Sequence, residues 1–140
     1  MNSVLEEQII ISLGSNLGDR LNALYKALAL LEAYPISIKL LSKVYETPAW
    51  GFKGDPFYNA CVSIKTKLKP KDLLEVLLKV EKTMGRLPSK GKGYSSRTID
   101  LDLLFYKSKN IFSAKLKVPH PKLHKRNFVL APLCEIAPKF

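Results

Sequence analysis

The sequence contains little cysteine: its 140 residues include two, Cys61 and Cys134. These two lie far apart, so the C-x-x-C spacing of zinc and redox sites is missing, and two cysteines are too few for a disulfide scaffold. We therefore expect both to be reduced side chains that serve in packing.

Long hydrophobic runs are also missing, and none approaches the roughly 20 residues that a membrane-spanning helix needs. Near the N-terminus, Glu6 and Glu7 precede a short apolar run, 9–11. This segment lacks the basic start and the long apolar stretch of a secretion signal. We expect a cytoplasmic protein that does not bind membranes.

Two common nucleotide-binding motifs are absent. Gly91-x-Gly93 lacks the later glycine of the dinucleotide fingerprint, and no Gly-Lys-Ser/Thr of a Walker phosphate loop occurs. The sequence also shows no internal repeat and no low-complexity segment. If the chain binds a nucleotide, it uses another arrangement.

Acidic residues are scarce, with 12 Asp and Glu against 23 Lys and Arg, which gives a net charge of +11. The hydrophobic and charged fractions, 46% and 25%, are ordinary for a globular protein. The length suits one domain, 1–140, with one core. A basic protein of this size usually binds an anion, and charge alone leaves nucleic acid, an anionic membrane and a phosphorylated small molecule open.

The residue pattern predicts strands and helices in the order strand, helix, strand, strand, helix, strand, strand. Strands are expected at 8–13, 36–46, 59–68, 99–106 and 114–118. Turns or loops are expected at 14–16, 48–56 and 107–110, and a partly helical tail at 119–140. This order predicts an α+β fold of the ferredoxin-like kind, an antiparallel sheet flanked by helices in a three-layer sandwich.

Capping residues mark the two helices. Asp19 can cap the first, in which Leu21, Leu24, Leu28 and Leu31 recur at helical spacing. The second helix opens with Pro70 and Asp72, carries the apolar stripe Leu73, Leu77, Val80 and Met84, and ends at Gly85. In the strand that precedes it, Ala60, Val62, Ile64 and Leu68 take one face and polar side chains the other, which predicts a half-buried strand.

The stretch "RTIDLDLLF", residues 97–105, places Asp100 and Asp102 inside an apolar run. Strand alternation sends both carboxylates to one face, roughly 7 Å apart at their α-carbons, together with Leu104 and Tyr106. A buried carboxylate needs a positive partner, and a pair can share divalent cations. Two metals about 4 Å apart can hold both ends of a phosphoryl displacement. The alternative is a solvent-facing sheet edge on which the two acids are merely hydrated.

The preceding segment, "GRLPSKGKGYSSR", is basic and rich in glycine, and it contains no acid. Arg86, Lys90, Lys92 and Arg97 could bind phosphate oxygens. A polyphosphate chelated by magnesium would suit both this segment and the carboxylate pair, since magnesium prefers phosphates plus one or two carboxylates. The alternative is an ordinary hydrated surface loop.

Two further groups are less specific. His120 lies between prolines near His124, but no cysteine or acid joins them locally, so a zinc site is poorly supported. The aromatic residues Trp50, Phe57 and Phe128 occur in loops or at element ends, where a flat ring could stack between them. Ordinary core packing explains each of them equally well.

Several separated motifs in order resemble the 6-hydroxymethyl-7,8-dihydropterin pyrophosphokinase family of folate biosynthesis. They are "GSNLGDR", "YETPAWG", "FYNA", "EKTMGR", "RTIDLDLLF", "VPHP" and "RNFVLAPLCEIAP". Ordered motifs are more specific than any single one, and these extend from about Gln8 to the end of the chain.

The resemblance implies the ferredoxin-like fold and transfer of a pyrophosphoryl group from ATP to the pterin hydroxymethyl group, with AMP as the other product. It implies two magnesium ions on Asp100 and Asp102, and ATP as co-substrate. The pterin would contact Thr47, Pro48, Trp50, Phe57, Asn59 and Phe128. ATP would contact Glu81, Arg86, Lys90, Lys92, Arg97, Ile99, Lys115, His120 and Arg126, with Arg86 and Arg97 also counted as catalytic.

Family members commonly have an arginine where this chain has Pro88, so Lys90 or Lys92 would take its place. We expect a monomer whose partners are ATP and a reduced pterin, without nucleic acid. Two rivals remain: a nucleic-acid-binding module on a similar plan, which lacks the aromatic RNA-binding pattern in its central strands, and a relative without catalysis.

Overall fold

The computed structural model of the protein describes residues 8–48, 55–85, 99–107, 109–113, 116–119, 132–133 and 135–136. One antiparallel sheet has the strand order β2-β4-β1-β5, and β3 also pairs with β4. The sheet strands are β1 (Ile9–Ser15), β2 (Ile36–Leu41), β3 (Tyr45–Thr47), β4 (Phe57–Thr66) and β5 (Asp100–Tyr106). The helices are α2 (Arg20–Glu32) and α3 (Pro70–Thr83), and β6 (Ile111–Phe112) pairs with β7 (Lys117–Val118).

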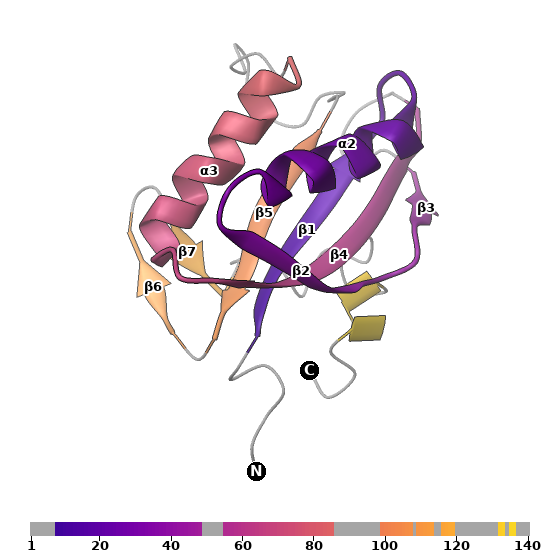
Figure 1. Ribbon diagram of the computed structural model, residues 1–140. Coiled ribbons are helices and arrows are strands. Elements are labelled where there is room, and N and C mark those ends of the chain that lie inside the picture. Colours follow the sequence, from indigo (N-terminus) through magenta and orange to yellow (C-terminus); the bar gives the residue numbers. More distant parts are fainter. Residues whose placement is uncertain are drawn as a thin grey trace.

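Both helices cover the same face of the sheet (Figure 1). Between them and the strands lies the main core, which includes Leu13, Leu31, Val62, Leu77 and Leu101. Burial of such aliphatic side chains contributes about 1.5–3 kcal/mol each, so this layer is the main source of stability. No helix in the described part of the chain is long and apolar enough to cross a membrane.

The predicted helix ends are confirmed. The Asp19 side chain accepts a hydrogen bond from the N–H of Asn22 at 3.1 Å, as an N-terminal cap does. Pro70 occupies the first turn of α3, where its missing N–H costs nothing. Gly85 follows the last turn of α3 with φ of +89°, a backbone conformation that favours glycine.

The apolar stripe of α2 differs from the prediction at its start. Leu21 is 41% exposed, whereas Ala23, Leu24, Ala27, Leu28 and Leu31 are buried. Alanines at 23 and 27 are small and let the helix approach the sheet. The buried face of α2 therefore includes these two alanines and excludes Leu21.

The opposite face of the sheet carries a second, smaller apolar cluster. Its members are Ile10, Cys61, Leu104, Phe105, Leu133 and Ile136. Leu133 and Ile136 come from the C-terminal part of the chain, which supplies the third layer. This cluster covers Cys61, and Ser63 on the same face is also buried, so the half-buried character predicted for β4 is wrong over 61–63.

Strand β5 does not keep a single alternation. Ile11 pairs with Leu103 and Ile10 with Phe105, so Leu104 is an extra residue in a β-bulge. The bulge reverses the alternation: Phe105 joins the second cluster, and Tyr106 joins the main core. The predicted faces of Phe105 and Tyr106 are therefore wrong, while those of residues 99–104 are confirmed.

Other predicted boundaries also shift. Gly14 and Ser15, expected in a turn, continue β1. The strand expected over 36–46 is divided into two strands, β2 and β3, because residues 42–44 between them are not in a strand. The last strand is β7, shorter than the predicted 114–118; residues 114–115 lie outside the described part. The predicted α+β class, with helices on an antiparallel sheet, is confirmed.

Candidate active site

One row of residues runs across the strands β3, β4, β1 and β5. Tyr45 pairs with Asn59, Asn59 with Gly14, and Gly14 with Asp100. Two residues along β1, Ser12 lies between Cys61 and Asp102 in the same way. The register thus places Asn59, an expected pterin contact, on β4, with only β1 between it and the expected metal ligands on β5.

The row lies on the face of the sheet away from the helices. Leu13, Ala60 and Leu101 belong to the main core on the helix side, and strand alternation sends their neighbours to the other side. Asp100 and Asp102 are both half-buried, so the carboxylates are neither in the core nor fully hydrated. The predicted common face of the two acids is confirmed.

Gly14 occupies the position between Asn59 and Asp100, and sequence reasoning assigned it no role in the site. A β-carbon at this position would lie 3.1 Å from Asn59 Oδ1 and 3.5 Å from a ring carbon of Phe57. Glycine inside a strand often marks a close approach of another group, and this was the available signal. Its missing side chain leaves the space in front of Asn59 and Phe57 open.

The expected pterin residues within the described chain lie together. The Asn59 amide donates a hydrogen bond to Thr47 Oγ1 at 2.7 Å. Thr47 pairs with Phe57, which is half-buried, and Pro48 is exposed next to them. This bond holds the Asn59 amide in one orientation, with its oxygen near Gly14.

The C-terminal segment is attached to this region by Glu135, which sequence reasoning also left without a role. Its carboxylate accepts hydrogen bonds from the Tyr45 hydroxyl at 2.7 Å and from the Lys43 N–H at 2.9 Å. The Tyr45 bond, and then the Lys43 bond, lower the pKa of the Glu135 carboxyl from its ordinary value despite an opposing effect of burial. Glu135 therefore joins the third layer to the chain that leads into β3.

Two residues expected at the nucleotide lie on the other side of the sheet. Ile99 is fully buried in the main core, so only its backbone could contact ATP. Glu81 is 4% exposed, and its Oε2 accepts a hydrogen bond from the Leu101 N–H at 2.8 Å. Glu81 therefore contacts the strand that carries the two aspartates.

The remaining predicted site residues lie outside the described part of the chain. They are Trp50, Arg86, Lys90, Lys92, Arg97, Lys115, His120, Arg126 and Phe128. The positive partners expected for Asp100 and Asp102 are among them.

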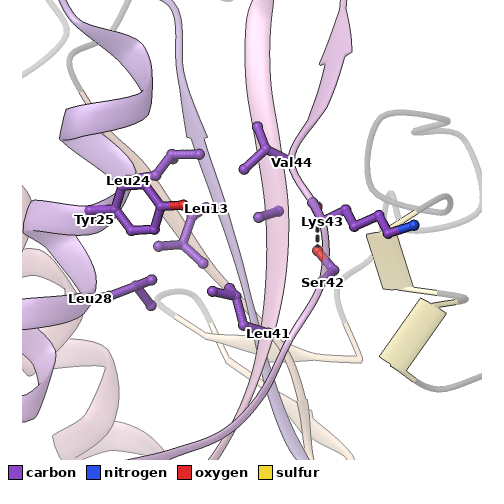
Figure 2. A pocket seen from close by; sticks show the side chains of 9 residues that line it. Leu13, Leu24, Tyr25, Leu28, Leu41, Ser42, Lys43 and Val44 are labelled. Atoms are coloured by element: carbon purple, nitrogen blue, oxygen red, sulfur yellow. Dashed lines mark hydrogen bonds between the residues drawn. The ribbon is translucent and has the colours of Figure 1, made fainter.

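Two cavities lie away from the row. One, of about 100 Å³, lies between α2 and residues 41–44 and is also lined by Leu13 and Ala60 of the sheet (Figure 2). The other, of about 490 Å³, lies at the opposite end of the sheet and is lined by Lys39, Lys65, Lys67 and Lys107 among others. Neither includes a residue predicted for the site.

Cys61 is a buried thiol that pairs with Ser12 across β4 and β1 and forms no disulfide within the described residues. Burial raises the pKa of its thiol to about 12, so the thiol stays protonated at neutral pH and is a poor nucleophile. The prediction of a reduced packing residue is confirmed for Cys61; Cys134 lies outside the described residues.

Asp100 and Asp102 fit a magnesium site completed by water and substrate better than a metal site whose ligands all come from the protein. Within the described residues, no three metal-ligating side chains of His, Cys, Asp or Glu gather at one point. Magnesium rarely needs such a cage, because it binds one or two carboxylates and completes its shell with water and substrate phosphates. A half-buried carboxylate pair on one strand face fits that habit.

Comparison with known proteins identifies relatives along almost the whole chain. The family model of 7,8-dihydro-6-hydroxymethylpterin-pyrophosphokinase matches residues 10–138. A "2-amino-4-hydroxy-6-hydroxymethyldihydropteridine pyrophosphokinase" of Porphyromonas gingivalis is 41% identical over 133 residues, which are 93% of this chain and 90% of that protein. A "Folate synthesis bifunctional protein" of Arabidopsis thaliana is 46% identical over 131 residues, 93% of this chain but 27% of the relative.

The chain therefore spans about a quarter of the bifunctional relative and nearly all of the bacterial one. A crystal structure described as HPPK-DHPS in complex with substrates matches with a TM-score of 0.70 at 14% identity, over 95% of this chain and 40% of that one. This similarity supports the ferredoxin-like α+β fold. Given the family match over residues 10–138, the chain belongs to the 7,8-dihydro-6-hydroxymethylpterin-pyrophosphokinase family.

Proposed function

We propose that the protein transfers the pyrophosphoryl group of ATP to the hydroxymethyl oxygen of 6-hydroxymethyl-7,8-dihydropterin in folate biosynthesis. The new bond forms between that oxygen and the β-phosphorus of ATP. The bond from the β-phosphorus to the oxygen shared with the α-phosphate breaks, AMP leaves, and the hydroxyl proton passes to an aspartate or to water. The observation that supports this most is the row on which Asn59, Gly14 and Asp100 lie side by side, in a chain of this family.

The pterin would bind at the Asn59 end of the row. Asn59 would hydrogen-bond the polar edge of the ring, and Phe57 and Phe128 would stack on its two faces. Thr47 fixes the Asn59 amide, while the backbone around Pro48 and Trp50 would complete the pocket. Gly14 would leave room for the hydroxymethyl group, which then points along the row towards Asp100.

Asp100 and Asp102 would hold two magnesium ions, which neutralise the triphosphate and align its β-phosphorus with the hydroxymethyl oxygen when bound. The protein's own task is to keep the two carboxylates on one face at the end of the pterin site. Phosphoryl transfer depends mostly on alignment and charge neutralisation, so this placement is the main requirement.

Basic side chains would neutralise the phosphates from the other side. Arg86 and Arg97 are the main candidates because a guanidinium can bind phosphate with two parallel hydrogen bonds. Lys90, Lys92, Lys115, His120 and Arg126 would add positive charge around the nucleotide. We further propose that 1–140 forms one domain that acts as a cytoplasmic monomer, without nucleic acid or membrane.

The test is an assay of AMP release with ATP, magnesium and 6-hydroxymethyl-7,8-dihydropterin. The wild-type protein should release AMP only when the pterin is present, and Asp100→Ala and Asp102→Ala should each lower kcat by about a thousandfold or more, as expected for a lost ligand of a metal that neutralises the reacting phosphates. Asp72→Ala is the matched control, because Asp72 is exposed on α3, away from the row.

Pterin-independent AMP release, or near-normal activity of both aspartate variants, would contradict the proposal. A thermal melt of each variant checks folding. Half-buried carboxylates on a polar face should tolerate alanine with little change in Tm, so activity and stability should separate.

A further inference from the structure

Strand β5 is the outer strand of the sheet, so it is bonded to another strand on one side only. Among the described strands, its neighbour is β1, and no strand follows on the other side. Along an antiparallel strand, the backbone N–H groups of alternate residues point to opposite sides. The residue between the two aspartates, Leu101, points its N–H away from β1.

That N–H is taken up by a side chain from α3. Glu81 Oε2 accepts it at 2.8 Å, across 20 residues of sequence. In Figure 1, α3 runs alongside β5, which allows a helix side chain to reach the strand edge. The carboxylate thus occupies the place that the carbonyl of a further strand would take.

A carboxylate is an unfavourable choice at this position if packing is its only role. Glu81 is 4% exposed and continues the buried stripe of Leu73, Val76, Leu77 and Val80. Burying a carboxylate costs more than burying an aliphatic side chain, and replacing buried charged groups with apolar residues often leaves stability unchanged or higher. The placement of Glu81 at the peptide between Asp100 and Asp102 suggests a role in the site.

We propose that Glu81 is a positioning residue, which fixes the Leu101 peptide so that Asp100 and Asp102 keep their places on the helix-free face. This inference rests on the proposed function. In this role Glu81 acts through the backbone, because its carboxylate binds the Leu101 N–H from the helix side of the sheet. A strand held from one side only can shift, and in β5 the bulge at Leu104 directly follows the segment that carries the two aspartates.

Three variants separate this role from the alternatives. Glu81→Gln keeps an oxygen that can accept the Leu101 N–H and removes the charge. Glu81→Met keeps the volume and removes the acceptor. Glu75→Met is the matched control, because Glu75 is exposed on the same helix. Each variant is measured for kcat, for KM of both substrates, for unfolding in urea, and for hydrogen exchange of the Leu101 amide by NMR.

We expect Glu81→Met to lower kcat at least tenfold with KM for the pterin within about threefold of wild type, and to speed exchange of the Leu101 amide. Glu81→Gln should retain kcat within about threefold, and Glu75→Met should match wild type. A loss in Glu81→Gln as large as in Glu81→Met would overturn the proposal, because the charge itself would then be needed. So would unchanged kcat in Glu81→Met despite faster amide exchange, or a loss of activity that only follows the unfolded fraction.

The two proposals fail in different ways. If the wild-type protein releases no AMP, the proposed function fails, yet amide exchange still reports whether Glu81 holds the peptide. If the wild type is active and the Leu101 amide exchanges equally in all variants, the positioning role alone is wrong.

Discussion

The two faces of the sheet differ in how their residues are used. On the helix side, the inward side chains of β1, β4 and β5 belong to one continuous apolar core beneath α2 and α3. On the other side, the same three strands carry an apolar cluster around Cys61 and Phe105 and, beyond it, the polar row from Asn59 to Asp100. One face is thus devoted to stability, while the other divides its length between packing and the site.

This division predicts that substitutions on the two faces affect different quantities. Changes on the helix side should alter the free energy of unfolding, and changes in the row should alter substrate use. Four substitutions test this, beginning with the largest expected effect.

Leu77→Ala should lower the free energy of unfolding by about 2–5 kcal/mol, because it opens a cavity in the main core. Urea unfolding followed by circular dichroism measures the change. The adjacent Leu78 is 54% exposed, so Leu78→Ala is the control and should stay within about 0.5 kcal/mol. Equal losses in the two variants would mean that α3 does not present Leu77 to the core.

Gly14→Ala should raise the KM for the pterin about tenfold, because its β-carbon would lie 3.1 Å from Asn59 Oδ1 and force a shift there. Steady-state kinetics with varied pterin provide the measurement. In an Asn59→Ala background the same change should add little, since the crowded oxygen is gone. Additive effects of the two substitutions would show that Gly14 and Asn59 do not share one binding space.

Thr47→Val should raise the KM for the pterin about threefold, since it removes the acceptor of the Asn59 amide bond at 2.7 Å while keeping the shape. Thr66→Val is the control: it removes a hydrogen bond to the Pro35 carbonyl at the opposite end of β4. The control should leave the KM unchanged. A KM shift of the same size in both variants would point to general loosening of β4.

Glu135→Gln should have the smallest effect, and that effect should depend on pH. The Tyr45 and Lys43 bonds lower the pKa of the folded-state carboxyl, so its contribution to stability is present above the unfolded-state pKa and is lost as pH falls through the folded-state pKa. Tm should therefore be lower in the variant than in the wild type at pH 7, and the difference should vanish in acid. A difference that persists well below pH 4 would contradict this.

The residues of the helix-side face could be predicted from the sequence, because the periodic spacing of hydrophobic residues determines which side chains are buried there. Leu13, Leu31, Leu77 and Leu101 could be placed in the core by spacing alone. The caps at Asp19 and Gly85 were predictable for the same local reasons. The prediction that Leu21 is buried was wrong because it followed the spacing of leucines alone. That spacing ignores Ala23 and Ala27, which form part of the buried face.

The other face could be predicted only in part. The common face of Asp100 and Asp102 followed from alternation, but the bulge at Leu104 depends on register with β1, which no local pattern reveals. The cover over Cys61 comes from Leu133 and Ile136, and no local pattern shows that these distant residues form a third layer. Gly14 and Glu135 were missed because their roles arise from contacts between distant segments.

The extra residue at Leu104 divides β5 into two segments whose side chains alternate in opposite phase. Before it, odd-numbered positions face the helices; after it, the even-numbered Tyr106 does, and its hydroxyl reaches the Leu68 carbonyl just ahead of α3. Deleting Leu104 would restore strict alternation and leave Phe105 and Tyr106 on their present sides, because Leu103 and Phe105 already pair with consecutive residues of β1. The extra residue therefore adds the Leu104 side chain to the second apolar cluster without changing the face of the acidic pair or the Tyr106 anchor at Leu68.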